Sequence, residues 1–323
     1  SLELWRVHIK TALHGGRGAT GRNGQDYRER REGAVVEVLE RNTETVVGRF
    51  SEEHSACFVI PDNKRINQDI MVPPEGCGEA QAGQIVIVEL IEQPGAHSRP
   101  LGRIKEVLGE HMAPGMEIRI AIASHGIPVE WPEAVLEEAH CYGETVPESV
   151  SQGRWDLRGT ALVTIDGITA RDFDDAVYCE RRGANWRLLV AIADVSAYVR
   201  PGMALDQEAR KRGNAVYFPD RAIPMLPEAL SNGLCSLKPA VDRLSLVCEM
   251  TFDSEGHMIR SRFAEAVMRS QARLTYDTVA TIVANRDPKV RAEYAKLVPH
   301  LDRLYELYQV LRLVREQRGA MDF

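Results

Sequence analysis

Six short runs of β-forming residues follow one another between residues 34 and 109, with turn residues between them. In order they read AVVEVLE from Ala34, TVVGRF from Thr45, CFVIPD from Cys57, DIMVPP from Asp69, QIVIVELIE from Gln84 and LGRIKEVLG from Leu101. Valine, isoleucine and phenylalanine suit a pleated surface that is buried on one side, whereas glycine, proline, asparagine and aspartate mark turns. Five or six strands in so short a stretch predict a small β-barrel.

The predicted barrel leaves most of the chain unaccounted for. The oligonucleotide-binding barrel has this number of strands and this length, and other small β-barrels fit the pattern equally. The whole chain has 323 residues, which is too long for one ordinary core and suits two or three domains. We therefore expect a multidomain protein in which residues 32–110 form the barrel.

The pattern changes to helices and mixed elements after residue 110. Pro132 opens and Gly143 closes the segment WPEAVLEEAHCYG, which predicts a helical connection over residues 111–155. Strand-like runs ALVTID, DDAVYCE and WRLLVAIADVS come next, followed by a helix over DQEARKRG. The run RLSLVCEMTF is apolar at every second position and turns at residues 254–256, which predicts an antiparallel strand pair. The second domain is thus predicted to be α+β, with a mixed or antiparallel sheet.

The composition excludes several classes of protein. No apolar run is long enough to span a bilayer, so we expect no membrane partner and a cytoplasmic location. The six cysteines never form a CxxC pair, which argues against zinc sites and disulfide frameworks. A net charge of −7 argues against a protein that coats nucleic acid with its whole surface. Any contact with nucleic acid must therefore be local.

Residues 11–32 are rich in glycine and arginine and have almost no apolar periodicity. This composition is typical of a mobile basic linker. Such a segment serves either as a tether for nucleic acid or as a solvated connector between domains, and the sequence leaves both interpretations open.

Four aspartates gather in the segment TIDGITARDFDDAVYCE. Asp166 ends a β-like run, and a short loop leads from it to Asp172, Asp174 and Asp175. Carboxylates this close repel one another and raise one another's pKa, so a divalent cation that neutralises them favours the arrangement. Ligands that are all oxygen select Mg²⁺, Mn²⁺ or Ca²⁺ over zinc or copper. The segment therefore predicts a site for a hard cation.

Three interpretations of this segment compete on the residues alone. A structural calcium loop uses alternating acidic residues, a glycine at the turn and a late glutamate, and the segment lacks that register. A solvated acidic turn is common for two or three carboxylates, but Val163, Phe173 and Val177 place these aspartates beside a core. A phosphoryl-transfer centre, in which metal ions activate water and stabilise the leaving oxygen, is the interpretation that the segment favours.

The aspartate segment closely resembles a motif of the catalytic RNB domain shared by ribonuclease R and ribonuclease II. The resemblance continues, in the same order, through WRLLVAIADVSAYVRPG, LDQEARKRGNAVYFPDRAIPMLPEALSNGLCSLKP, VDRLSLVCEM and ARLTYD. These runs look more like ribonuclease R than ribonuclease II. The barrel region resembles the second cold-shock domain of the same family, so the resemblance extends from about residue 32 to the end of the chain.

The resemblance implies a processive hydrolase that degrades single-stranded RNA from its 3′ end toward its 5′ end and releases nucleoside 5′-monophosphates. It implies Mg²⁺ as the cofactor, with Mn²⁺ as an alternative. Catalysis and metal binding are assigned by the resemblance to Asp166, Asp172, Asp174 and Asp175. Asp174 matches the aspartate most closely tied to cleavage. Tyr217 matches an aromatic residue that packs against a base near the 3′ end, and Tyr276 matches a tyrosine beside the catalytic pocket.

The resemblance is incomplete at both ends of the chain. The family's catalytic domain continues beyond the equivalent of Phe323, with an arginine-bearing motif that contacts the scissile phosphate. Residues 1–31 are expected to hold a remnant of a first cold-shock domain and the basic linker, and residues 156–323 the N-terminal half of the catalytic domain. We therefore expect a truncated chain whose C-terminal half is missing. The alternative function is RNA binding with weak or no cleavage.

A set of arginines near the last strands has two interpretations. Phosphate contacts supply affinity for RNA independently of its sequence, and arginines on one strand face can provide them. A solvated strand face accounts for the same residues. The set comprises Arg260, Arg262, Arg269 and Arg273.

Overall fold

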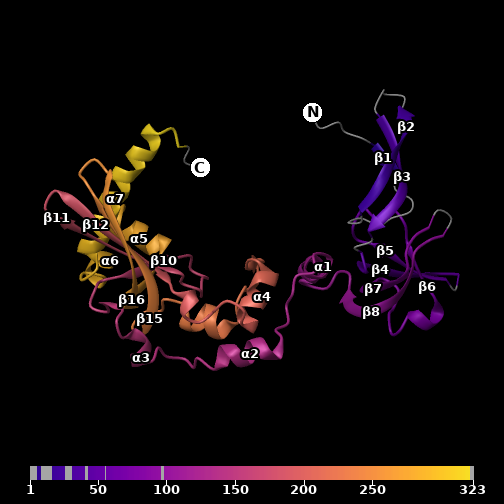
Figure 1. The fold of residues 1–323 in the computed structure, drawn as a ribbon, viewed down its shortest axis with the longest axis horizontal. Helices are drawn as coiled ribbons and strands as arrows, with labels where there is room; N and C mark the ends of the chain where they lie inside the picture. Colours follow the sequence, from indigo (N-terminus) through magenta and orange to yellow (C-terminus); the bar gives the residue numbers. More distant parts are fainter. Residues whose placement is uncertain are drawn as a thin grey trace. The chain divides into compact units, whose positions relative to one another are not determined.

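The computed structural model describes residues 6–8, 17–25, 31–40, 43–54, 56–95 and 98–320. The chain divides into two compact units, Ser1–Pro128 and Val129–Phe323 (Figure 1). Each unit has its own hydrophobic core. Within the described ranges, no helix combines the length and the apolarity needed to cross a bilayer.

Five strands of the first unit close into a barrel. They are β4 (Thr45–Glu53), β5 (Ala56–Pro61), β6 (Ile70–Val72), β7 (Gln84–Glu92) and β8 (Leu101–Glu110), in the order β4-β5-β6-β8-β7. Phe50 is only 2% exposed and fills the interior with Val59 and Ile70. A Cβ at residue 48 would overlap the carbonyl oxygen of Ile60, so glycine there permits close strand pairing. The small β-barrel predicted from the sequence is confirmed.

Two short helices pack beside the barrel strands. The 3₁₀ turn η1 (Pro74–Gly76) follows β6, and α1 (Met116–Ser124) follows β8. Met116 is buried against Val47, Ile85 and Leu108, which face away from the barrel interior. The barrel sheet is therefore covered by apolar contacts on part of its outer face as well.

A separate three-stranded sheet precedes the barrel. Its strands are β1 (Arg6–His8), β2 (Arg17–Gln25) and β3 (Arg31–Glu40), in the order β1-β3-β2. The run from Ala34 thus forms a strand outside the barrel, and β2 occupies part of the segment predicted to be a mobile linker. A strand pattern identifies a strand but not its partner, because contacts far along the chain choose the partner. The predicted cold-shock remnant lies outside the described residues, apart from β1.

A seven-stranded mixed sheet forms the centre of the second unit. Its strands are β9 (Trp155–Leu157), β10 (Val163–Asp166), β11 (Asp175–Arg182), β12 (Asn185–Ala193), β15 (Asp242–Phe252), β16 (Met258–Arg269) and β17 (Ala272–Thr275). The order is β17-β10-β11-β12-β15-β16-β9, with β17 and β9 parallel to their neighbours. β15 and β16 pair antiparallel on either side of residues 254–256. The predicted mixed sheet and its hairpin are confirmed.

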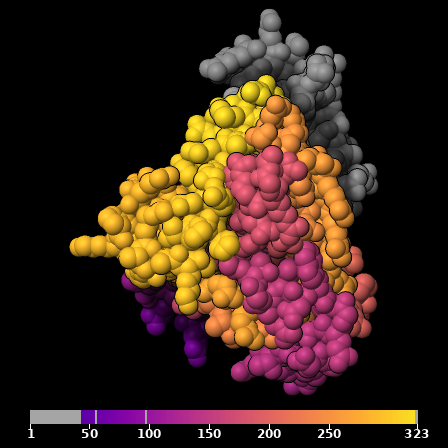
Figure 2. All heavy atoms as spheres, turned by 90° about the vertical axis from the view of Figure 1, so that its left-hand side faces the viewer, coloured from indigo at the N-terminus to yellow at the C-terminus, as the bar shows by residue number. Residues whose placement is uncertain are grey.

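Helices cover both faces of this sheet. Successive residues of β12 point to opposite faces, so neighbouring leucines of this strand belong to different cores. Leu189 belongs to a core with α2 (Glu133–His140) and α4 (Ala204–Arg212), while Leu188 packs toward α7 (Val298–Gln317). The same core as Leu189 contains residues of the π-helical turn η3 (Ala229–Leu234). α5 (Tyr276–Val283) packs beside α7, and α6 (Pro288–Glu293) connects them. Figure 2 shows the atoms of the C-terminal residues in yellow on the face turned toward the viewer.

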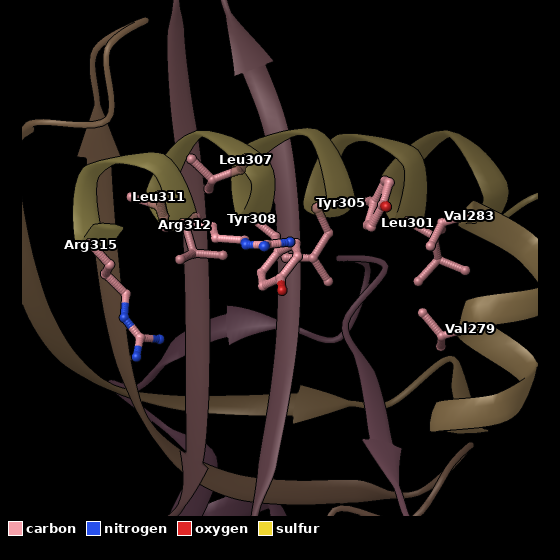
Figure 3. A pocket seen from close by; sticks show the side chains of 11 residues that line it. Val279, Val283, Leu301, Tyr305, Leu307, Tyr308, Leu311, Arg312 and Arg315 are labelled. Carbon is pink, nitrogen blue, oxygen red and sulfur yellow. The ribbon is translucent and has the colours of Figure 1, made fainter. Parts of the chain in front are cut away.

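An apolar groove of about 810 Å³ runs between α5, α7 and β12. Tyr308, Leu311 and Arg315 of α7 line one side of it, as Figure 3 shows. None of the four aspartates lines this groove. The aspartate site predicted from the sequence therefore lies elsewhere, at the ends of the strands.

Candidate active site

The fold brings the four aspartates to one end of the sheet. Asp166 is the last residue of β10 and Asp175 is the first residue of β11. Because these strands pair antiparallel, the end of one meets the start of the next. The backbone carbonyl of Asp174 accepts a 2.9 Å hydrogen bond from the Ala193 N–H, which continues the pairing of β11 with β12. We call the loop between Asp166 and Asp175 the aspartate loop.

The charges of the aspartate loop act on one another. Burial raises the pKa of Asp166, and Asp175 and Asp172 raise it further, against the lowering effect of Arg273. The pKa of Asp174 is also raised, first because protein atoms withdraw water from its carboxyl and then because of the other three aspartates. Oδ2 of Asp166 is buried and has no hydrogen-bond partner. Such a group is costly unless a proton or a cation reaches it.

Tyr217 reaches the same loop from a distant part of the sequence. It lies on the two-residue strand β13 (Val216–Tyr217), which pairs with β14 (Ala222–Ile223). Its hydroxyl donates a 3.0 Å hydrogen bond to Oδ2 of Asp172, and this bond is the first cause of the raised pKa of Tyr217. The ring remains 68% exposed. The structure thus joins two residues that the sequence analysis predicted separately.

Tyr276 lies at the same end of the sheet. It is the first residue of α5 and follows Thr275, which is the register partner of Asp166 in the parallel pairing of β10 and β17. Its side chain is 64% exposed. Tyr217 thus contacts the aspartate loop through its hydroxyl, and Tyr276 follows in sequence the strand residue that is paired with Asp166.

Ser236 holds the second part of the aspartate loop and was not predicted from the sequence. Its hydroxyl accepts a 3.0 Å hydrogen bond from the Phe173 N–H and donates one of 3.0 Å to the Arg171 carbonyl. Ser236 is fully buried, and the Leu237 N–H bonds the Phe173 carbonyl at 2.8 Å. Asp172 is thus fixed between two anchored neighbours. No local pattern marks Ser236, because its partners lie more than sixty residues earlier.

The four arginines near the last strands do not act as one set. Arg269 forms a 2.7 Å ion pair with Asp242, and the Arg262 guanidinium lies 5.4 Å from the Trp155 ring centre. Arg260 is exposed on β16, whereas Arg273 turns toward the aspartate loop. Arg273 thus differs in its contacts from the three arginines of β16, and the phosphate path stays a prediction.

The donor atoms at the aspartate loop suit a hard cation, but they do not close around one point. All four side chains offer carboxylate oxygens, and one of these oxygens is buried without a partner. In the part of the chain that the structure describes, no three His, Cys, Asp or Glu side chains converge as the ligands of a metal ion. The loop thus offers the donor chemistry of a hard-cation site.

Two domain families match this chain. The RNB domain matches residues 154–323, which is more than half of the chain, and the cold shock domain matches residues 58–132. Both matches agree with the position of the α+β unit and of the barrel.

Known proteins resemble the chain over nearly its whole length. Ribonuclease R of Vibrio cholerae is 50% identical over 316 residues, which are 98% of this chain and 38% of that protein. Ribonuclease R of Acidithiobacillus ferrooxidans is 51% identical over 303 residues, which are 93% of this chain and 69% of that protein. The chain therefore spans about two fifths of the Vibrio relative.

Solved structures give the same result. RNase R of Mycoplasma genitalium, in its apo form and in complex with ribose methylated single-stranded RNA, superposes with a TM-score of 0.86 at 27% identity. The match covers 98% of this chain and 50% of that one. Taken with the domain matches and the sequence identities, this similarity shows that the chain belongs to the ribonuclease R family, with a cold shock domain followed by an RNB domain.

Proposed function

We propose that this chain carries the aspartate side of the active site of a magnesium-dependent exoribonuclease. On this proposal the enzyme hydrolyses single-stranded RNA processively from its 3′ end toward its 5′ end and releases nucleoside 5′-monophosphates. The observation that supports it best is the gathering of four mutually repelling carboxylates beside an exposed tyrosine. The relatives from Vibrio cholerae and Acidithiobacillus ferrooxidans, both named ribonuclease R, support the same class of reaction.

Asp166, Asp172, Asp174 and Asp175 are the proposed ligands of Mg²⁺, with Mn²⁺ as an alternative. Both ions prefer oxygen ligands. When bound, such an ion activates a water molecule and stabilises the leaving oxygen of the phosphodiester. The raised pKa values of Asp166 and Asp174 support the same view.

The exposed rings of Tyr217 and Tyr276 are the proposed contacts for the 3′ end of the RNA. Aromatic rings stack on any base, so they suit an enzyme that moves along RNA without regard to sequence. Because the Tyr217 hydroxyl is hydrogen-bonded to Asp172, a base stacked on this ring lies close to the aspartate loop. The barrel of the first unit offers a second surface for RNA, by its likeness to the cold shock domain.

RNA binding without cleavage is the second candidate function. The match to the cold shock domain and the exposed rings of Tyr217 and Tyr276 favour it, because such contacts with RNA need no metal ion. On this alternative, the C-terminal half of the same enzyme supplies the rest of the active site. The cytoplasmic location and the domain limits predicted from the sequence stay predictions.

Labelled RNA distinguishes the two functions. The chain is incubated with Mg²⁺ and single-stranded RNA labelled at the 3′ or the 5′ end, alongside an Asp174→Asn variant. Early release of labelled mononucleotide from the 3′ label, lost in the variant and in EDTA, supports the exoribonuclease. RNA binding that is equal in both proteins, with no mononucleotide released, contradicts it and supports the binding function.

A further inference from the structure

Arg273 holds the first part of the aspartate loop from the neighbouring strand. It lies on β17, where it is the register partner of Thr164 on β10. Its Nη2 donates hydrogen bonds of 2.8 Å to the carbonyl oxygens of both Gly167 and Ile168, the two residues that follow Asp166. One side chain thus ties the start of the loop to the sheet.

A further contact of Arg273 also reaches the loop. Its Cζ lies 5.5 Å from the ring centre of Phe173, which stands between Asp172 and Asp174. Its Nε is buried and has no hydrogen-bond partner. Both hydrogen bonds come from Nη2 alone and go to backbone carbonyl oxygens instead of a carboxylate. This arrangement serves the shape of the loop more than the neutralisation of a charge.

The position and the charge of Arg273 have opposite effects on a cation. A positive charge near Asp166 repels a metal ion bound there, so the charge alone weakens binding. The two hydrogen bonds restrict the loop and keep its carboxylates near one another, so the position strengthens binding. The sign of the change on removing Arg273 therefore tells which effect dominates.

We propose that Arg273 is a positioning residue that fixes the aspartate loop for cation binding, and this inference rests on the function proposed above. Without Arg273 the residues after Asp166 lose their tie to β17, and the carboxylates move apart under their mutual repulsion. Loss of such an outer support typically lowers metal affinity roughly ten- to hundredfold. A lysine keeps the charge but carries its donors on a flexible ammonium group without the planar guanidinium, so it replaces this contact only in part.

Manganese titrations of the whole chain test this role. Mn²⁺ binding is followed by the EPR signal of the free ion at mildly alkaline pH, for the wild-type chain and for Arg273→Met, Arg273→Lys and Asp174→Asn. Arg269→Met is the matched control, because Arg269 pairs with Asp242 and does not contact the loop. Hydrogen exchange of the amides from Gly167 to Phe173, without metal, reports the order of the loop.

The proposal is supported if Arg273→Met binds Mn²⁺ about tenfold more weakly or worse and Arg273→Lys shows a smaller loss. The loop amides should also exchange faster, and Arg269→Met should behave like the wild-type chain. The lysine variant keeps the charge and most of the stem, so it remains informative if the methionine variant folds poorly. Equal or tighter binding in folded Arg273 variants overturns the role of Arg273 alone. Wild-type binding that is absent, or insensitive to Asp174→Asn, overturns the proposed function together with this role.

Discussion

The hydroxyl of Tyr217 donates a 3.0 Å hydrogen bond to Oδ2 of Asp172, although the two residues are 45 positions apart in the sequence. The bond uses only the edge of the side chain and leaves the ring 68% exposed. Tyr217 is thus placed to orient a carboxylate with its hydroxyl and to present a flat face to a base. The two roles can be separated by mutation.

Replacing Tyr217 with alanine is expected to weaken the binding of single-stranded RNA, whereas phenylalanine keeps most of it. Stacking of a base on an aromatic ring contributes about 1–3 kcal/mol, and phenylalanine retains the ring. Fluorescence anisotropy with a short RNA in EDTA measures this contribution without cleavage. Tyr308→Ala on α7 is the control, since Tyr308 is also exposed and lies in the groove away from the aspartates. Equal affinity of the Tyr217→Ala and wild-type chains would contradict the stacking role.

The Asp174→Asn variant is expected to melt a few degrees higher than the wild-type chain at neutral pH without metal. The pKa of Asp174 is raised in the folded chain, so the folded state binds this proton more tightly than the unfolded state does. Stability from this group is therefore present at acidic pH and is lost as the pH rises through the raised pKa. Asparagine is uncharged at every pH, so the variant does not lose this stability as the pH rises. Thermal melts in EDTA, repeated at acidic pH where the difference should shrink, check the prediction.

Added Mg²⁺ is expected to raise the melting temperature of the wild-type chain and to have less effect on Asp174→Asn. A cation that binds the folded state stabilises it by mass action. Ca²⁺ is the comparison, because a structural calcium loop would respond to Ca²⁺ far more than to Mg²⁺. A response to neither ion would count against any cation at the aspartate loop.

The elements that the sequence predicts well are those whose signals are local. The strands of the barrel, the turn at residues 254–256 and the helix limits at Pro132 and Gly213 all follow from residues within a few positions of the element. Gly213, for example, has φ +78° just after α4, a conformation that glycine adopts without steric cost. The four aspartates were identified for the same reason, since they fall within one short segment.

The contacts that the sequence could not predict join residues far apart. Ser236 and Arg273 hold the aspartate loop through backbone groups, which carry no sequence signal. The side-chain bond between Tyr217 and Asp172 also joins distant residues, and so does the pairing of β3 with β1 and β2 instead of the barrel. Patterns give elements and residue types, whereas the partners of each side chain are set by the tertiary fold.

Replacing Arg154 with methionine is expected to destabilise the second unit by about 3 kcal/mol, because it leaves a buried carboxylate without its ion pair. Arg154 Nη1 lies 2.7 Å from Oδ2 of Asp194, whose side chain is 1% exposed. Urea unfolding followed by tryptophan fluorescence measures the change. The pair of Arg303 and Glu306 on α7 is exposed, so Arg303→Met should cost less than about 1 kcal/mol. Similar costs for the two variants would show that the burial of Asp194 is not what makes its pair important.

The packing of α7 on the sheet can be tested with two leucines on the same helix. Leu307 is 1% exposed and packs among Cys179, Trp186 and Phe252, whereas Leu313 is 59% exposed. Leu307→Ala removes buried apolar atoms and leaves a cavity, which typically costs about 2–5 kcal/mol, while Leu313→Ala should change the free energy of unfolding by less than about 0.5 kcal/mol. Urea unfolding followed by tryptophan fluorescence measures the change, and Trp186 beside Leu307 contributes to the signal. If both variants unfold at the wild-type urea concentration, α7 does not stabilise the sheet that carries the aspartate loop.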